Sequence, residues 1–389
     1  MKIRVAMAMA ALTMVLGAVG APKAGAEVSG GWDFRTIGLN GTYFPLVGQF
    51  AGDAATDIFW YAPGTGADSL WIGKAGSRGA NAFTKVPMTV NKSYIPVVGD
   101  FFGDDYTDIL WYSPGTGADA VWVSANVPGY FTSQAITING TFKPTVLHDF
   151  TAANRKDDIL WYAPGSAGDY LWHFDESGSG AKTTKNLTMS ATNYQVVVGD
   201  WNADLLDDVF LYAPGSTADY RWASKPDGTF ATSRKDVTST LKPVTVYQTT
   251  GDGILWWGDG TGKESYWVRS SATFASRTIP SVNVHASPTP GALQTVYIEA
   301  PTDIDGAFVG TSSGGDWYSL VDQASQSKHD QTSQLPVIGD FDDDDYADVI
   351  WYGAGTVKDE LWYTAPGSSS SSRANPLQDQ VRETPFQER

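Results

Sequence analysis

A module of about 50 residues recurs along the chain, and this repeat restricts the possible folds more than any other feature. Residues 97–123 form the clearest copy: a strand, an acidic loop, a second strand, a Pro-Gly turn and a third strand. One residue just before the second strand anchors each copy. These anchors are Asp57, Asp108, Asp158, Asp208, Gly253, Gly306 and Asp348, at intervals of 51, 50, 50, 45, 53 and 42 residues. A period near 50 with four short strands per unit is typical of a propeller blade.

Two large apolar residues eleven positions apart mark six of the seven copies. The pairs are Trp60 and Trp71, Trp111 and Trp122, Trp161 and Trp172, Leu211 and Trp222, Trp256 and Trp267, and Trp351 and Trp362. The copy near Gly306 keeps Phe308 and Trp317, but at a different spacing. The sequence therefore predicts an all-β fold, a seven-bladed propeller of four-stranded blades.

The two ends of the repeat region are each incomplete. Residues 32–39 alternate in polarity and end in a tight-turn signal, Asn40-Gly41, as the fourth strands of other copies do. The seventh copy has three strands and no clear fourth. We therefore expect residues 32–39 to complete the last blade beside residues 361–363, which would close the ring and remove its open edges.

The second strand of each copy is apolar on both sides. In residues 108–112, Ile109 and Trp111 point one way, and Leu110 and Tyr112 point the other. A strand that is buried on both faces fits a sheet packed between two neighbouring blades.

The first residues predict export. Lys2 and Arg4 precede a mostly apolar run, and Ala24-Gly25-Ala26 resembles a small-residue cleavage site. We expect a signal peptide at residues 1–26 that is cleaved after Ala26, a propeller at 27–364 and a disordered tail at 365–389. The apolar run is too short for a membrane span, so the mature protein is predicted to be secreted and soluble. We also expect it to be a monomer.

Charge narrows the choice of partners. After cleavage the chain would carry 23 basic and 43 acidic residues, a net charge of −20. This charge opposes binding to nucleic acids or anionic membranes. It suits cations, basic partners or neutral ligands. The alternative is that the negative charge only keeps the protein soluble. The chain has no cysteine, so it must be stabilised by its core or by bound ions.

The loops before the second strands are candidate metal sites. Oxygen-bearing side chains stand at positions 1, 3, 5 and 9 of the seventh loop, and positions 1, 5 and 9 of the second. The candidate ligands are Asp340, Asp342, Asp344 and Asp348 in copy seven, Asp200, Asn202, Asp204 and Asp208 in copy four, and Asp100, Asp104 and Asp108 in copy two. Such spacing can turn several oxygens onto one centre, as calcium requires. The alternative is a set of solvated polar turns in which the last aspartate only caps the loop.

These units resemble the FG-GAP/VCBS repeats of integrin-alpha-type propellers, whose loop runs roughly D-x-[DN]-x-[DN]-G-x-x-D. The resemblance implies a propeller with calcium in the loops between first and second strands. The family glycine at position 6 is replaced by Asp105, Leu205 and Asp345 in copies two, four and seven, and this position usually needs a permissive backbone. Copy three has Asp149, Asn154 and Asp158 but is one residue longer, and copies five and six lack the loop.

Other groups suggest function less directly. An aspartate and a tryptophan follow the Pro-Gly turn, as in Asp68 and Trp71, and could bind a sugar if exposed; recurrence within a strand favours a core role instead. We found no catalytic motif, although carboxylate pairs for glycoside hydrolysis can meet only in space. We therefore expect a non-catalytic, calcium-stabilised module that binds a glycan or an extracellular protein. The alternative is a hydrolase or lyase acting on extracellular polysaccharide.

Overall fold

The computed structural model describes residues 32–364 with gaps. The gaps are at 53, 65–66, 116, 150–155, 165–167, 175–179, 190–192, 216–217, 247–250, 258–264, 271–272, 279–292, 297–305, 312–313, 320–324, 330–333 and 345–347. The predicted signal peptide and tail lie outside the described residues. Among the residues that are described, no apolar helix reaches membrane-spanning length.

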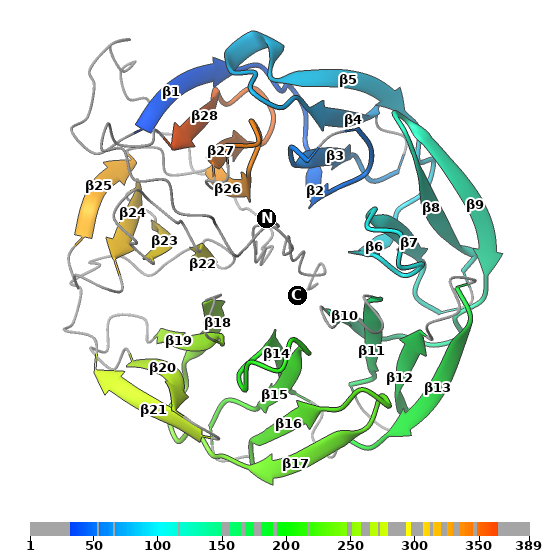
Figure 1. Ribbon diagram of the computed structural model, residues 1–389, viewed down its shortest axis with the longest axis vertical. Helices are drawn as coiled ribbons and strands as arrows, with labels where there is room; N and C mark the ends of the chain where they lie inside the picture. The colour runs from blue at the N-terminus through cyan, green and yellow to red at the C-terminus, as the bar shows by residue number, and fades with distance from the viewer. Residues whose placement is uncertain are drawn as a thin grey trace.

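The described strands pair in antiparallel sheets of four, arranged around a common axis (Figure 1). We number the blades by sequence copy. Blade one contains β2 (Phe44–Gly48), β3 (Asp57–Tyr61), β4 (Asp68–Gly73) and β5 (Phe83–Met88). Blade two contains β6 (Ile95–Gly99), β7 (Asp108–Tyr112), β8 (Asp119–Val127) and β9 (Tyr130–Ile136). Blade three contains β10 (Lys143–Leu147), β11 (Asp158–Tyr162), β12 (Asp169–Phe174) and β13 (Lys182–Leu187).

The remaining blades follow the same order. Blade four contains β14 (Gln195–Gly199), β15 (Asp208–Tyr212), β16 (Tyr220–Ser224) and β17 (Phe230–Arg234). Blade five contains β18 (Lys242–Val246), β19 (Gly253–Trp257), β20 (Ser265–Ser270) and β21 (Thr273–Thr278). Blade seven contains β26 (Gln334–Gly339), β27 (Asp348–Gly353), β28 (Asp359–Thr364) and β1 (Trp32–Ile37). One short 3-10 helix, η1 (Gly79–Asn81), precedes β5.

The prediction of a seven-bladed propeller requires a correction. Six blades, one to five and seven, have described side chains that bury a core. The sixth copy is described by backbone pairing alone, as a sheet of β22 (Leu293–Val296), β23 (Gly306–Thr311), β24 (Gly314–Ser319) and β25 (Ser325–His329). This copy has glycine in place of the anchoring aspartate and a shortened aromatic spacing. Its sequence thus departs from the repeat at both the anchor and the aromatic pair.

The predicted closure of the ring is confirmed. β1 pairs antiparallel with β28, and the register sets Arg35 opposite Leu361 and Phe34 opposite Trp362. The N-terminal strand thus completes the sheet of the last copy. Neighbouring turns add to this seam, because Gly41 and Gly355 exchange backbone hydrogen bonds at 3.0 and 2.6 Å.

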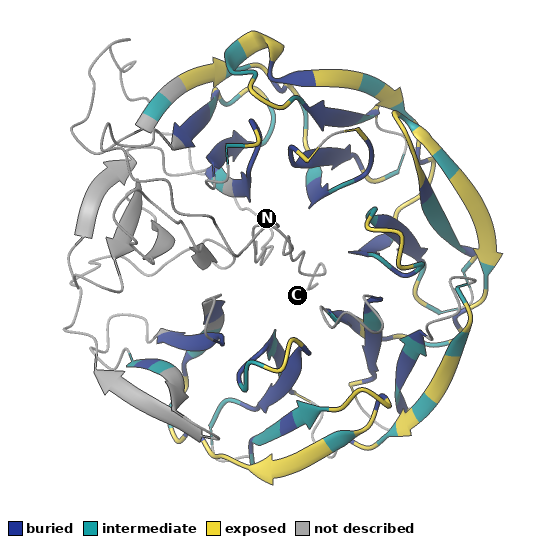
Figure 2. Ribbon diagram, viewed as in Figure 1, coloured by how far each residue is buried: buried dark blue, intermediate teal, exposed yellow. Residues whose placement is uncertain are grey.

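The cores lie between blades, as the two-sided second strands predicted. All five residues of β3 are buried: Ile58 and Trp60 join the cluster shared with blade seven, and Phe59 and Tyr61 join the cluster shared with blade two. The outer strands are the exposed layer (Figure 2). Burial of both faces of a sheet between neighbours explains why a single copy would have no complete core.

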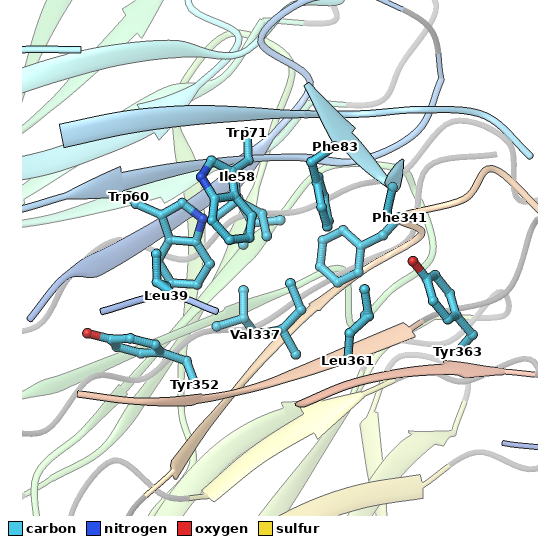
Figure 3. Close-up of a cluster of buried hydrophobic side chains, with 13 residues drawn as sticks. Leu39, Ile58, Trp60, Trp71, Phe83, Val337, Phe341, Tyr352, Leu361 and Tyr363 are labelled. Carbon is cyan, nitrogen blue, oxygen red and sulfur yellow. The ribbon is translucent and has the colours of Figure 1, made fainter. Parts of the chain in front are cut away.

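A tyrosine and a tryptophan meet at most described blade interfaces. Tyr352 packs on Trp60 with ring centroids 5.1 Å apart, within the cluster that joins blades seven and one (Figure 3). Equivalent pairs are Tyr61 with Trp111, Tyr112 with Trp161 and Tyr212 with Trp256, at 4.9, 5.2 and 5.0 Å. The recurrent tryptophans are therefore core residues.

One hairpin departs from the repeat. β8 has nine residues whereas β4 has six, and its pairing with β9 is irregular between Ser124 and Val127. The extension leans on blade one: Asn126 Oδ1 accepts a hydrogen bond from the Gly52 N–H at 3.1 Å. At the tip, Val127 is 52% exposed and Tyr130 is 59% exposed.

Candidate metal centre

Each acidic loop is held at its first residue by the blade that follows. The Asp100 N–H donates to the Asp157 carboxylate at 2.8 Å, and the Asp157 N–H donates back to the Asp100 carbonyl at 2.9 Å. We call this reciprocal pair the interblade clasp. Within the described residues it also joins Asp340 with Thr56, Gln49 with Thr107, His148 with Asp207 and Asp200 with Asp252. Because both partners flank buried strands, the clasp fixes the point at which each loop begins.

The anchoring aspartate fixes the other end of the loop. Asp108 Oδ2 accepts a hydrogen bond from the Phe101 N–H at 3.0 Å, and its Oδ1 accepts one from the Ser124 N–H at 3.0 Å. Asp348 accepts from the Phe341 N–H in the same way, at 3.0 Å. Burial raises the pKa of Asp108 well above its usual value, despite these donors. The anchoring aspartates therefore cap their loops. This capping role was the alternative to metal binding that the sequence left open.

The loop of blade seven brings three of its four predicted ligands together. Carboxylate oxygens of Asp340, Asp342 and Asp348 all lie within 4.8 Å of one another, and all three residues are buried. Oδ1 of Asp342 is buried and has no hydrogen-bond partner among the described residues. A buried carboxylate oxygen is costly unless a donor or a cation satisfies it. Since hard cations such as calcium take six to eight oxygens, this donor set fits such an ion.

The fourth predicted ligand of this loop has a different partner. Asp344 Oδ2 accepts a hydrogen bond from Nη2 of Arg78 at 2.8 Å, and Nε of Arg78 donates to Oδ2 of Asp342. Arg78 comes from blade one, in the connection between β4 and β5. The same connection donates from the Gly76 N–H to the Asp342 carbonyl at 2.6 Å. An arginine from another blade is therefore inserted into the predicted metal loop.

The loop of blade two does not gather its predicted ligands. Asp100 accepts hydrogen bonds from the N–H groups of Gly103, Asp104 and Asp105, at 2.6, 3.2 and 2.8 Å. Burial raises the pKa of Asp100 to about 7. The methylene stem of Lys156, a residue only 2% exposed, lies against Gly103. Here the loop is organised by its own backbone.

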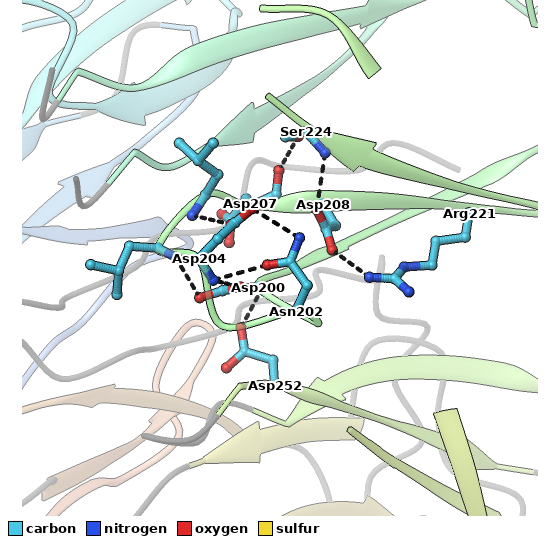
Figure 4. A network of polar contacts seen from close by, with 10 residues as sticks. Asp200, Asn202, Asp204, Asp207, Asp208, Arg221, Ser224 and Asp252 are labelled. Carbon is cyan, nitrogen blue, oxygen red and sulfur yellow. Dashed lines mark hydrogen bonds and ion pairs between the residues drawn. The ribbon is translucent and has the colours of Figure 1, made fainter. Parts of the chain in front are cut away.

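The loop of blade four is a similar hydrogen-bonded network (Figure 4). Asp200 accepts from the Asp204 N–H at 3.1 Å, and the Asn202 amide donates to Asp204 at 2.9 Å. Asp208 accepts from Nη2 of Arg221 at 3.1 Å and from the Ser224 N–H at 3.0 Å. Burial raises the pKa of Asp208 to about 7. Within the described residues, only blade seven has three carboxylates close enough to share an ion.

Loops two and four keep a left-handed backbone at position 6, where FG-GAP/VCBS repeats have glycine. Asp105 and Leu205, at position 6 of loops two and four, have φ angles of 67° and 71°. This left-handed region favours glycine, so both loops carry local strain. Asp345, at the same position in loop seven, lies outside the described residues.

The predicted loop of copy three requires a correction. His148, and not Asp149, holds the first position, because His148 makes the clasp with Asp207. Its Nδ1 lies 2.9 Å from Asp157, and Nδ1 of His173 lies 2.8 Å from Asp158. Histidines thus contact two carboxylates at the end of this loop, His148 from within the loop and His173 from β12.

The aspartate after each Pro-Gly turn has a structural role. Asp68 accepts hydrogen bonds at 2.6 Å from the N–H groups of Ala62 and Val90, and so ties the end of the second strand to the end of the fourth. The equivalents Asp119, Asp169, Asp219 and Asp359 each accept the same two bonds. Asp68 and Trp71 are 2% and 3% exposed. The sugar-binding alternative for these pairs is therefore wrong.

Two functional groups were missed in the sequence. The clasp residue directly precedes the anchor, as Thr56, Thr107, Asp157, Asp207 and Asp252, so a hydrogen-bonding residue at that position was a visible signal. Arg78 lies in a turn that the repeat does not conserve in length or composition, and its partner loop is more than 260 residues away. No local pattern could have linked them.

Comparisons with known proteins support the fold. A lectin of Agrocybe aegerita, described as specifically recognising non-reducing terminal N-acetylglucosamine, has a TM-score of 0.56 at 13% identity, over 75% of this chain and 81% of that chain. A protein from Lactobacillus plantarum has a TM-score of 0.48 at 13% identity, over 75% and 86%. No family model and no curated protein sequence matches the chain. The likeness to the lectin agrees with a propeller and shows the fold alone.

Proposed function

We propose that this chain is a secreted, non-catalytic propeller that binds glycans and is stabilised by a divalent cation in the loop of blade seven. The observation that carries the binding role is the β8–β9 hairpin, whose tip presents Tyr130 to solvent at 59% exposure. A lectin of similar fold recognises a sugar, which favours a glycan over a protein partner. We also propose that its repeats are of the FG-GAP/VCBS type, which their acidic loops resemble.

The hairpin is built as a firm platform. A side chain at Gly129 would collide with Val86 of blade one, so the tip rests directly on the neighbouring sheet. Asn126, with a φ of 53°, completes the bulge and holds Gly52. A tyrosine ring on a rigid support can stack on the apolar face of a sugar with little loss of conformational entropy.

The cation site would use the carboxylates that converge in blade seven. Asp340, Asp342 and Asp348 would hold the ion, and backbone carbonyls and water would complete its shell. Bound calcium would neutralise like charges that repel one another at this distance. It would thereby stabilise the loop of blade seven itself.

The buried aspartates support binding over catalysis. Those at the anchor and after the Pro-Gly turn accept hydrogen bonds from backbone N–H groups in nearly every described blade. Their carboxylates are occupied in holding the fold, and a catalytic pair would need oxygens that face a substrate.

A glycan array tests the proposal. The wild-type protein should bind selectively and release no product, and Tyr130→Ala should lose most binding while Tyr106→Ala, changed elsewhere on the surface, should not. Product release would support the polysaccharide-active alternative. The absence of selective glycan binding would contradict the proposed function. N-terminal sequencing of protein recovered from the medium tests export, with cleavage expected after Ala26.

A further inference from the structure

The guanidinium of Arg78 stands among the carboxylates of loop seven, where the sequence predicted a metal. It comes from blade one and contacts Asp342 and Asp344, two of the four predicted ligands. The side chain is 31% exposed, and its carbon Cζ lies 4.9 Å from the ring centroid of Tyr363. A cationic group held by two carboxylates and an aromatic face is well fixed in position.

We propose that Arg78 is a built-in competitor of the divalent cation, so that the loop of blade seven binds either Arg78 or the ion through Asp342 and Asp344. This inference rests on the proposed cation site and adds its regulation. While Arg78 is docked, Asp344 is turned to the guanidinium, and the ion is left with Asp340, Asp348 and Oδ1 of Asp342. Release of Arg78 returns Asp344 and the second oxygen of Asp342 to the ion.

One observation points to a ligand at this site in addition to the acidic sequence. Oδ1 of Asp342 is buried without a partner among the described residues, although Oδ2 of the same carboxylate holds Arg78. The loop also carries six acidic residues between positions 340 and 348, so one arginine leaves most of the charge uncompensated. A cation therefore remains attracted even when Arg78 is docked.

Displacement of Arg78 by the ion would loosen the seam between blades one and seven. The segment that carries Arg78 is tied to blade seven by the Gly76 N–H on the Asp342 carbonyl and by the Gly79 N–H on the Tyr363 hydroxyl, at 2.6 and 3.2 Å. When the ion displaces Arg78, this segment loses its ionic contacts. Exchange of the Gly76 and Gly79 amide hydrogens should then become faster.

Calorimetric titration of the full chain with calcium alone tests the proposal. Arg78→Ala should bind calcium about tenfold more tightly than the wild type, because one competing charge is removed. Arg78→Lys retains the charge and should stay close to wild type. Arg234→Ala, which removes an exposed arginine paired with Asp236 in blade four, is the matched control and should have no effect.

The outcomes separate the two proposals. If Arg78→Ala and the wild type bind calcium equally, competition is refuted and the cation site stands. If only Arg78→Ala binds, competition is supported and the cation site of the wild-type protein is refuted. If no variant binds, both fail. Hydrogen exchange on the wild type gives a second readout: slower exchange at residues 76–79 with calcium would also overturn the inference.

Discussion

Thr56 of blade one and Asp340 of blade seven hold each other by two hydrogen bonds. The Thr56 N–H donates to the Asp340 carbonyl at 2.7 Å, and the Asp340 N–H donates to the Thr56 hydroxyl at 3.0 Å. The two residues are 284 positions apart and meet only because the ring closes. The clasp that links successive blades thus also spans the point where the chain ends meet.

Thr56→Val should weaken this seam. Valine has a similar shape but no hydroxyl, so the buried Asp340 N–H loses its acceptor, at a cost of about 1–3 kcal/mol. Urea unfolding should show a lower midpoint with an unchanged m-value. Thr84→Val, an exposed threonine on β5, should leave the midpoint within error. Equal midpoints for both variants would mean that the clasp adds no stability.

Asp359 should make stability fall as pH rises. Burial raises its pKa from 3.8 to about 6 in the folded protein, so the folded state binds this proton more tightly than the unfolded state does. The resulting stabilisation is complete below pH 3.8 and is lost as the pH rises through 6. The check is the difference in unfolding free energy between wild type and Asp359→Asn from pH 3.5 to 7. A difference that is flat, or that grows in favour of the wild type, would contradict the assignment.

Tyr112 should matter through its hydroxyl. It donates to the Gly140 carbonyl at 2.7 Å and accepts from the Phe142 N–H at 2.9 Å, which fixes the connection between blades two and three. Tyr112→Phe removes both bonds and should cost about 1–3 kcal/mol. Tyr130→Phe removes the hydroxyl of an exposed tyrosine and should be neutral, so thermal or chemical denaturation of the pair isolates the buried hydroxyl. Comparable losses in the two variants would refute a role specific to Tyr112.

The sequence predicted those parts of the fold that repeat locally. Paired tryptophans and the anchor aspartate recur at fixed spacing, so the blades, their two-sided second strands and the pairing of β1 with β28 followed from periodicity. The sixth copy was counted as a seventh blade of the ring, although Gly306 replaces its anchor and Phe308 and Trp317 stand at a changed spacing. Periodicity alone thus led to a count of seven.

The site was predicted less completely, because its chemistry depends on contacts between blades. The spacing of Asp340, Asp342 and Asp348 predicted their convergence, and the same spacing in loop four produced instead a network around Asp200 and Asp208. What differs is the partner. Arg221 lies in the same blade as loop four, and loop seven meets Arg78 from another blade. Neither arginine has a fixed place in the repeat, so sequence spacing could not decide between metal and guanidinium.

Calcium should stabilise the protein through loop seven alone. The thermal midpoint should rise with calcium and fall with a chelator, because the ion binds the folded state and not the unfolded chain. Asp340→Asn and Asp348→Asn should each abolish most of this rise, since each removes a converging carboxylate. Asp200→Asn and Asp204→Asn should lower the midpoint by weakening loop four but should keep the calcium-dependent rise in full. Calorimetric scans of the four variants, each with and without calcium, make the comparison. A rise lost in the loop-four variants, or retained in both loop-seven variants, would show that the ion binds elsewhere.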